Sequence, residues 1–291
     1  MAHHVISRRT GSIPADDGSS ITWDLYLPGD RSGRALPVII FLHGFKGFKD
    51  WGPFPDACEA ISEAGFAVMA VNFSHNGIGE DPRVFDRLDL FRRETLSRDL
   101  DEVDLVIRAL KEGDVDAGGR RLNTDAIGLL GHSRGGHTAV AAAAEYEEVA
   151  CLVTWSAVAD YNQRWSEEMI ADWEDKGVTE IRNGRTGQMM PVDRVVWDDA
   201  RENAGRLMAA ERVKELHIPV LFVHARGDES VPPADAELLH RNCPSADKKL
   251  MLVPGTGHTF GGSHPFGEES FPEPFEKMLG RTAGWFEDHL L

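Results

Sequence analysis

Continuous apolar segments of strand length recur along this chain, and they constrain its fold more than any other feature. The first long one covers residues 37–43, with the sequence Pro-Val-Ile-Ile-Phe-Leu-His. A strand that is apolar on both faces is covered by protein on both sides, which is typical of a parallel sheet packed between helices. The chain is therefore expected to form such a sheet. The other segments of this kind are residues 66–73, 126–130, 149–155, 219–224 and 249–253.

Helical patterns occupy most of the intervals between these segments. Strands that alternate with helices of ten or more residues form an α/β fold, a mostly parallel twisted sheet with right-handed crossovers and flanking helices. Two shorter strand patterns, at 5–9 and 21–27, are separated by a turn sequence at 15–18 and predict an antiparallel hairpin. The predicted helices are 54–64, 93–111, 135–146, 234–242 and 275–290.

One interval interrupts the alternation. Residues 160–216 contain scattered glycines and two helix-like pieces, at 166–176 and 196–212. A chain of 291 residues can bury one large core, and α/β domains of this length often stay single. We therefore expect one domain over residues 1–291, with residues 160–216 inserted as a cap over the carboxyl edge of the sheet.

The charge of the chain argues against several classes of partner. Acidic residues outnumber basic ones 48 to 31, a formal net charge of −17, and such a surface repels nucleic acid and anionic membranes. No stretch reaches the roughly 18 apolar residues of a membrane span, and the first residues lack the apolar core of a secretory signal. We expect a cytoplasmic protein without nucleic-acid or membrane partners. Its oligomeric state does not follow from the sequence.

The cysteines do not form a recognisable framework. Cys58, Cys151 and Cys243 are widely spaced and odd in number. This usage fits reduced, mostly buried thiols better than disulfides or a metal site.

The pentapeptide Gly131-His132-Ser133-Arg134-Gly135 lies where a predicted strand meets a predicted helix. A serine between two glycines at such a junction is the sequence pattern of a nucleophile elbow. The turn is so tight that the positions two before and two after the serine have no room for bulky side chains. The pattern alone occurs by chance in about one chain in seven of this composition, so the assignment depends on the partners of Ser133.

A serine nucleophile needs a base within hydrogen-bond distance and an acid that orients the base. Asp228 and His258 each follow one of the last two predicted central strands, so both lie in loops at carboxyl strand ends. Glycines beside His258 let its loop bend towards the serine. Asp160, after an earlier strand, and Glu229 are alternative acids.

With Ser133, Asp228 and His258 in this order, the chain resembles the α/β-hydrolase superfamily over nearly its full length. Within it, the chain is most similar to dienelactone-hydrolase-like and prolyl-oligopeptidase-like esterases. The resemblance implies that Ser133 is the nucleophile, that His258 acts as general base and then acid, and that Asp228 orients the imidazole.

The resemblance also implies an oxyanion hole formed by main-chain N–H groups. One donor belongs to Phe45, in the sequence His43-Gly44-Phe45 after the first central strand, and the other to Arg134. Such donors stabilise the negative charge on the former carbonyl oxygen, with about 2.7–4 kcal/mol at stake for one of them.

The substrate pocket is expected between the cap and the loops. Trp165 and Met189 in the cap, and His75 in a loop, are candidates to line it. Alternatively, the cap residues form the cap's own core and His75 is a surface histidine. Arg134 and Arg185 are candidates to attract a substrate carboxylate, with an ordinary solvated arginine as the alternative. Three further histidines are interpreted as structural: His132, His137 and His224.

A triad with an oxyanion hole implies acyl transfer to water through an acyl-enzyme, with no metal and no organic cofactor. We expect a carboxylesterase whose partner is a small-molecule ester of small to medium size. The serine at 133 argues against the thiol-dependent lactone hydrolases and the aspartate-dependent haloalkane dehalogenases of this fold. A serine peptidase, a thioesterase or acyltransferase, and a non-catalytic binding module are the alternatives.

Overall fold

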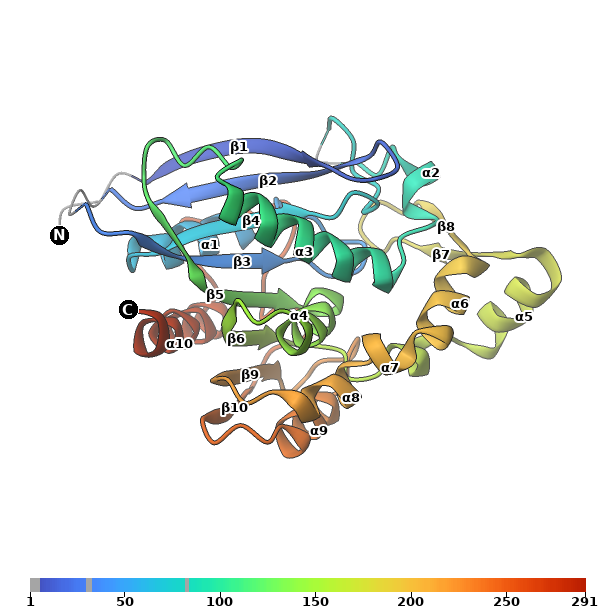
Figure 1. Cartoon of the computed structure of the whole chain (residues 1–291). Coiled ribbons are helices and arrows are strands. Elements are labelled where there is room, and N and C mark those ends of the chain that lie inside the picture. The colour runs from blue at the N-terminus through green and yellow to red at the C-terminus, as the bar shows by residue number, and fades with distance from the viewer. Residues whose placement is uncertain (1–5, 30–32, 82–83) are drawn as a thin grey trace.

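A sheet of eight strands forms the centre of the computed structural model, which describes residues 6–29, 33–81 and 84–291 (Figure 1). The strands are β1 (Ser7–Pro14), β2 (Ser20–Leu27), β3 (Leu36–Leu42), β4 (Ala67–Asn72), β5 (Leu122–His132), β6 (Val149–Trp155), β9 (Val220–Ala225) and β10 (Lys248–Val253). They are ordered β1-β2-β4-β3-β5-β6-β9-β10. The pairs β1–β2 and β2–β4 are antiparallel, and the other neighbours are parallel. This confirms the predicted, mostly parallel sheet.

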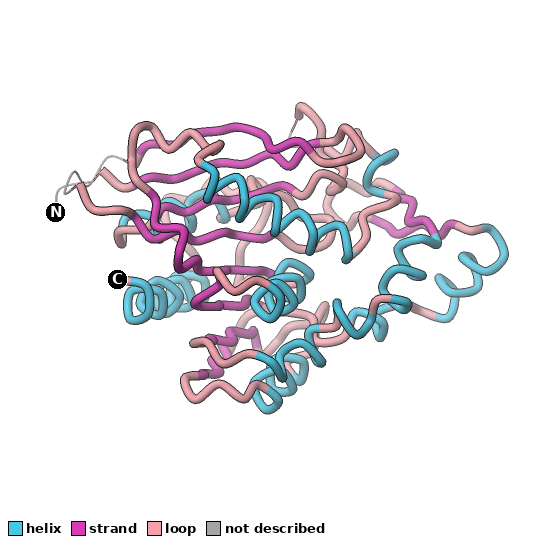
Figure 2. The backbone as a smooth tube through the Cα atoms, viewed as in Figure 1, coloured by secondary structure: helices cyan, strands magenta, loops and turns pink. Residues whose placement is uncertain are grey.

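Helices cover both faces of the sheet (Figure 2). Successive side chains of a strand point to opposite faces, so Val38 and Ile40 of β3 enter one core while Ile39 and Phe41 enter the other. The first core is closed by α3 (Leu96–Glu112), α4 (Arg134–Glu145) and α9 (Ala234–Asn242). The second is closed by α1 (Phe54–Glu63) and α10 (Glu273–Leu290).

The predicted bounds of strands and helices are wrong where the side chains show little hydrophobic periodicity. The first strand, expected at 5–9, continues to Pro14, and Val5 lies outside the described residues. β1 is an edge strand with mostly exposed residues, and its length is set by pairing with β2 along its whole extent. The short helix α2 (Leu88–Phe91) was not predicted, because four residues are too few to show a helical period.

Residues 160–216 lie between β6 and β9, and α5 and α6 stand beyond the arrowheads of β3 and β5 (Figure 1). The elements are η1 (Tyr161–Arg164), α5 (Glu167–Lys176), β7 (Val178–Arg182), β8 (Met189–Asp193), α6 (Arg194–Glu202), α7 (Ala204–Leu207), α8 (Ala209–Arg212) and η2 (Val213–Glu215). The hairpin of β7 and β8 was not predicted. The helix expected over 196–212 is three short helices, because Asn203 leaves helical geometry and Met208 is extended.

The three cysteines are buried and unpaired, as their number and spacing predicted. Cys58 lies on α1, Cys151 on β6 and Cys243 directly after α9. Within the described ranges, no helix has the length and apolar character needed to cross a membrane.

The inserted segment has an aromatic core of its own. Trp173 on α5 is fully buried, and its ring stacks on that of Trp197 with 5.7 Å between centroids. Its indole N–H donates a hydrogen bond of 2.8 Å to the Val192 carbonyl. Phe48 and Phe85, from loops outside the segment, belong to the same cluster. The segment therefore packs onto the loops at the sheet edge.

Trp173→Ala is expected to lower the free energy of unfolding by about 3–5 kcal/mol, because it leaves a cavity in a fully packed cluster. Val195→Ala, at an exposed position of α6, is the control and should change it by less than about 0.5 kcal/mol. Urea denaturation followed by circular dichroism measures both values. Equal stabilities of the two variants would contradict a stabilising role for this cluster.

Candidate active site

Ser133 occupies a strained turn between β5 and α4. Its backbone angles are φ 56° and ψ −116°, a conformation that residues with a side chain rarely adopt. Its N–H donates to the Trp155 carbonyl at 2.8 Å, which holds the turn against β6. Strain of this kind costs on the order of 1–3 kcal/mol and persists where the surrounding packing fixes it. The turn presents the serine side chain at the carboxyl edge of the sheet.

The two glycines of the pentapeptide leave the space that this turn requires. A Cβ at Gly131 would lie 2.3 Å from the carbonyl oxygen of Gly135. A Cβ at Gly135 would lie 2.3 Å from the carbonyl oxygen of Leu42, at the end of β3. Because these neighbours are backbone atoms, they cannot swing aside. The start of α4 thus packs directly on the end of β3.

The loop after β3 contacts the serine through Gly44, where a Cβ would lie 2.9 Å from the Cβ of Ser133. The next N–H group belongs to Phe45 and has no hydrogen-bond partner among the described residues. The same holds for Arg134 at the start of α4, because the first N–H groups of a helix have no partner within it. Two unpaired donors therefore lie next to Ser133.

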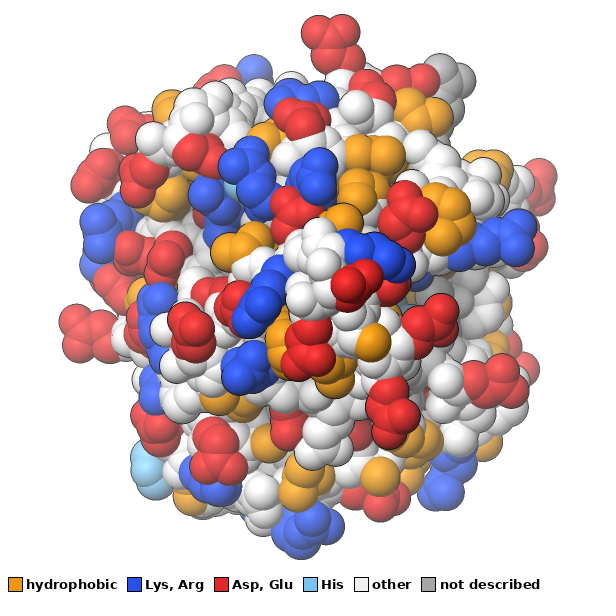
Figure 3. Space-filling model, turned by 90° about the vertical axis from the view of Figure 1, so that its right-hand side faces the viewer, with side chains coloured by type: hydrophobic (Ala, Val, Ile, Leu, Met, Phe, Trp, Pro, Cys, Tyr) orange, Lys and Arg blue, Asp and Glu red, His pale blue; other side chains and the backbone are white. Residues whose placement is uncertain are grey.

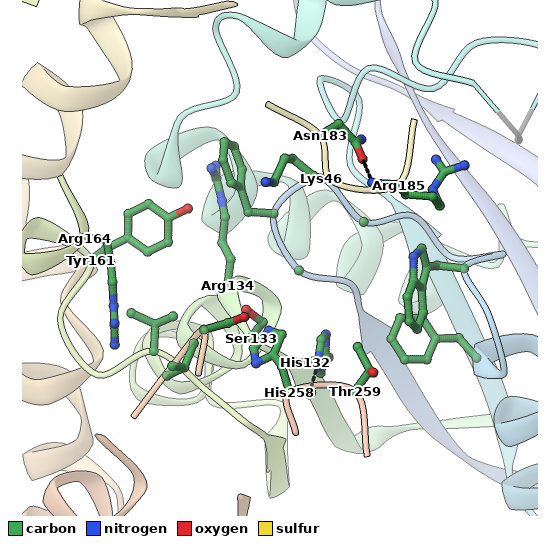
Figure 4. Close-up of a pocket in the computed structure, with 18 residues that line it drawn as sticks. Lys46, His132, Ser133, Arg134, Tyr161, Arg164, Asn183, Arg185, His258 and Thr259 are labelled. Carbon is green, nitrogen blue, oxygen red and sulfur yellow. Dashed lines mark hydrogen bonds between the residues drawn. The ribbon is translucent and has the colours of Figure 1, made fainter. Parts of the chain in front are cut away.

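His258 and Asp228 are joined by a hydrogen bond of 2.8 Å between Nδ1 and Oδ2. They follow β10 and β9, which are neighbouring parallel strands, so their loops meet at one edge of the sheet. The partly exposed imidazole lines the same cavity as Ser133 (Figure 4). An ionised carboxylate only accepts hydrogen bonds, so Nδ1 carries a proton, and in the neutral imidazole Nε2 is the nitrogen with the lone pair.

The Asp228 carboxyl is buried and ionised. Its Oδ1 accepts the N–H groups of Ser230 and Val231, each at 2.9 Å, and the His224 imidazole lies 3.4 Å from Oδ2. Burial by itself raises the pKa of this carboxyl. The hydrogen bonds from His224 and His258 outweigh burial and hold the pKa well below its usual range. The group therefore carries its negative charge at neutral pH.

His132 supports the loop of His258. Its Nε2–H donates to the main-chain carbonyl of His258 at 3.1 Å, and the two rings lie 4.8 Å apart. Burial, and then the nearby His258, lowers the pKa of His132 to about 3, so the ring is neutral. His132 was expected to be structural, and the part of the structure that it supports is the His258 loop of the site itself.

The Arg134 side chain is buried beneath the site. It was expected either to attract a substrate carboxylate or to be solvated, and both expectations are corrected. Its Nε donates to Asp99 at 2.8 Å, and Nη1 lies 3.6 Å from the Glu94 carboxylate. The guanidinium also lies over the rings of Phe45 and Tyr161, 5.4 and 5.5 Å from their centroids. These contacts tie α4 to α3 and to the loop after β3. The Asp99 carboxylate compensates the positive charge of Arg134 within the protein.

A cavity of about 510 Å³ opens over Ser133 and His258 (Figure 4). Apolar side chains of Trp51, Phe54 and Val158 form part of its wall. The described residues of the wall include no Asp or Glu, although the chain as a whole is acidic. Four cationic residues contribute to its wall: Lys46, Arg134, Arg164 and Arg185.

Three residues that we expected to bind substrate lie away from this cavity. Trp165 packs edge-on against Trp173 at 5.2 Å, so it belongs to the core of the inserted segment. Met189 is 49% exposed at the start of β8. His75 is buried and lies 2.9 Å from the Asp17 carboxylate, so it is neither a pocket residue nor a surface residue. Aromatic composition alone did not distinguish a packed core from a pocket.

The alternative acids do not contact His258. Asp160 begins η1, where its carboxylate accepts a main-chain N–H at 2.9 Å. Glu229 is exposed. His137 on α4 donates to the Val158 carbonyl at 3.0 Å inside the core.

Sequence patterns missed much of the cavity wall. Lys46 directly follows Phe45, so the loop that was predicted to approach Ser133 already indicated Lys46 as a wall residue. Tyr161, Arg164 and Asn183 come from the inserted segment, and no local pattern distinguishes them from other polar positions there (Figure 4). Only the folding of this segment over the sheet edge brings them near Ser133.

The site combines a hydroxyl, an imidazole with an available lone pair and unpaired N–H donors on one cavity. Such a set supports proton transfer from the hydroxyl to the imidazole and attack on a carbonyl carbon. In the part of the chain that the structure describes, no group of three or more His, Cys, Asp or Glu side chains is arranged to hold a metal ion.

The fold is that of an α/β hydrolase. A sequence model of the Alpha/beta hydrolase family matches residues 39–270, and the chain belongs to this family. This confirms the fold class and the resemblance to the superfamily expected from the motifs.

Relatives match nearly full length at low identity. The chain is 25% identical over 284 residues to an uncharacterised 31.7 kDa protein of Escherichia coli, covering 87% of this chain and 91% of the relative. It is 24% identical over 308 residues to a monoacylglycerol lipase of Mycolicibacterium smegmatis, covering 98% and 99%. Est1E of Butyrivibrio proteoclasticus with bound ferulic acid has the same fold, with a TM-score of 0.70, 20% identity and coverage of 96% and 99%.

Gly135→Ala is expected to destabilise the protein by about 1–3 kcal/mol, because the added Cβ collides with backbone that cannot move. Gly280→Ala on α10 is the matched control, since a Cβ there meets nothing within 4 Å. Helix propensity should make that variant more stable by about 0.5–1 kcal/mol. Thermal melts of both variants measure the difference. Stabilisation by both substitutions would rule out the contact between α4 and β3.

A buried acid on α3 predicts a pH dependence of stability. Glu102 on α3 accepts the Ser74 N–H at 2.8 Å, yet burial outweighs this bond and raises the pKa of the carboxyl from 4.5 to about 7. A carboxyl with a raised folded-state pKa contributes stability that is complete below its unfolded pKa and is lost as the pH rises through the folded pKa. The contribution of this carboxyl to the free energy of unfolding should therefore fall between about pH 5 and pH 8.

Glu102→Gln is expected to remove this contribution, because the variant has no carboxyl at position 102, so its stability should fall less, or rise more, with increasing pH than that of the unmodified protein. Glu112→Gln, at an exposed position of the same helix, should retain the slope of the unmodified protein. Melting temperatures across this pH range measure both slopes. Equal slopes in Glu102→Gln and the unmodified protein would show that Glu102 makes no such contribution.

Proposed function

We propose that this protein is a serine carboxylesterase that hydrolyses small to medium esters through an acyl-enzyme. One arrangement carries the proposal. The strained turn at Ser133 faces the cavity that His258 also lines, and the buried, ionised Asp228 orients the His258 imidazole. In the proposal Ser133 is the nucleophile, His258 the general base and acid, and Asp228 the orienting acid.

The reaction proceeds in two halves. First, Nε2 of His258 takes the hydroxyl proton of Ser133 while Oγ attacks the ester carbonyl carbon, and Asp228 stabilises the imidazolium that forms. The N–H groups of Phe45 and Arg134 bind the oxygen that becomes negative. His258 then gives the proton to the departing alcohol, which leaves the acyl group on Ser133. In the second half water attacks this acyl group, and His258 moves the water proton to Ser133 Oγ as the carboxylic acid leaves.

Relatives and cavity size support an ester substrate. A relative that matches nearly the full chain is a monoacylglycerol lipase, and a protein of the same fold binds ferulic acid. The cavity of about 510 Å³ lies in the usual range of small-molecule pockets. Its apolar wall at Trp51 and Phe54 suits a hydrocarbon chain or ring. These features favour a small or medium ester.

Ser133→Ala is expected to reduce kcat/KM for p-nitrophenyl butyrate by a factor of about 10⁴ or more, because it removes the nucleophile. A fluorophosphonate probe should label the unmodified protein at Ser133, as read by mass spectrometry of the modified peptide. Ser270→Ala, at an exposed position away from the cavity, should retain both turnover and labelling.

Aminoacyl-nitroanilides and acyl-thioesters are assayed beside the ester. Faster turnover of either would replace the esterase with a peptidase or a thioesterase. If no ester is hydrolysed and no serine is labelled, the proposed chemistry is refuted and a binding module is the remaining reading.

A further inference from the structure

The cavity over Ser133 is lined by positive charge in a chain whose formal net charge is −17. On the face that carries the inserted segment, acidic and basic side chains are intermixed (Figure 3). The described part of the cavity wall, by contrast, includes cations and no Asp or Glu. Like charges gathered in a partly desolvated site repel one another. The cavity is therefore suited to a ligand that brings negative charge.

Two of the cations are compensated inside the protein. Arg134 is paired with Asp99 and lies close to Glu94. Arg164 is paired with Asp235 at 2.6 Å. Both arginines therefore add little net charge to the cavity.

Lys46 is not compensated in this way. Its side chain is half-buried, and Nζ contacts the Arg182 carbonyl at 3.4 Å. No carboxylate of the described residues lies within ion-pair distance of Nζ. Burial lowers the pKa of this ammonium group. A partly buried ammonium of this kind gains most from a carboxylate.

Lys46 lines the same cavity as Ser133. It lies two residues beyond Gly44, which touches Ser133, and the close-up shows it between Arg134 and Asn183 in the cavity (Figure 4). Its backbone has φ 56°, so a residue with a Cβ is held there at a conformational cost. An ester bound with its carbonyl at Ser133 therefore has a cation within the same cavity.

We infer that the preferred substrate is an ester that also carries a carboxylate, and that Lys46 binds this carboxylate. The inference rests on the proposed esterase function and adds the substrate class. Arg185 lies over the rings of Phe48 and Phe85 at the exposed rim of the same cavity. The carboxylate belongs to either the acyl chain or the alcohol, and matched esters distinguish the two.

Two pairs of esters test the inference on the unmodified protein. Monomethyl adipate and methyl hexanoate have the same chain and differ in a carboxylate on the acyl side. 4-Acetoxybenzoate and 4-methylphenyl acetate differ in a carboxylate on the alcohol side. In at least one pair, kcat/KM for the anionic ester should exceed that for the neutral ester by about tenfold, mostly through a lower KM.

Lys46→Gln is expected to lower this anionic-to-neutral ratio about tenfold. Lys46→Asn should do the same, and asparagine tolerates the positive φ of this position, so the second variant guards against a folding defect. Lys277→Gln removes the same charge from an exposed position on α10 and should leave the ratio unchanged. Circular dichroism confirms that each variant is folded.

The outcomes separate this inference from the esterase proposal. If neutral esters are hydrolysed through Ser133 but the ratio is the same with and without Lys46, the anion site is refuted and the esterase stands. If no ester is hydrolysed, calorimetric titration of monomethyl adipate into the unmodified protein and into Lys46→Gln decides the anion site alone. Binding lost in the variant supports the site, and equal binding, or no binding to either protein, overturns it.

Discussion

The close packing of the start of α4 on the end of β3 determines the geometry of the whole site. Without a side chain at Gly135, the helix backbone comes next to the carbonyl groups of Leu42 and His43. This contact brings the Ser133 turn, the first N–H of α4 and the loop at Gly44 to one point. The helix N-terminus adds a partial positive charge there. The strain at Ser133 is held because backbone surrounds the turn on both sides.

Charge compensation determines what each ionisable group in the site can do. Hydrogen bonds from His224, His258 and the main chain keep the buried Asp228 negative, so it can hold an imidazolium. Asp99 compensates Arg134, whose side chain thereby serves as a structural link between α3, α4 and the loop at Phe45. Removing charges from water is costly unless partners replace the water. Lys46 has no carboxylate partner among the described residues, so its charge is available to a ligand.

The sequence predicted elements whose cause is local. β3 and β6 were predictable because burial on both faces leaves an uninterrupted apolar run. The edge strand β1 was placed too early, because its extent depends on pairing with β2 and not on its own residues. The helical pattern over 196–212 missed the breaks at Asn203 and Met208, where the backbone leaves helical geometry.

The sequence by itself determined the features that adjacent residues define. The turn at Ser133 needs glycines within two residues, and Asp228 and His258 each follow a recognisable strand, so all three were identifiable from short segments. Tertiary structure alone decided what surrounds them. Lys46 and Arg164 reach one cavity because the loop after β3 and the inserted segment close over the same sheet edge. These two residues are brought to one cavity by packing between distant parts of the chain, so no short stretch of sequence predicts that they lie together.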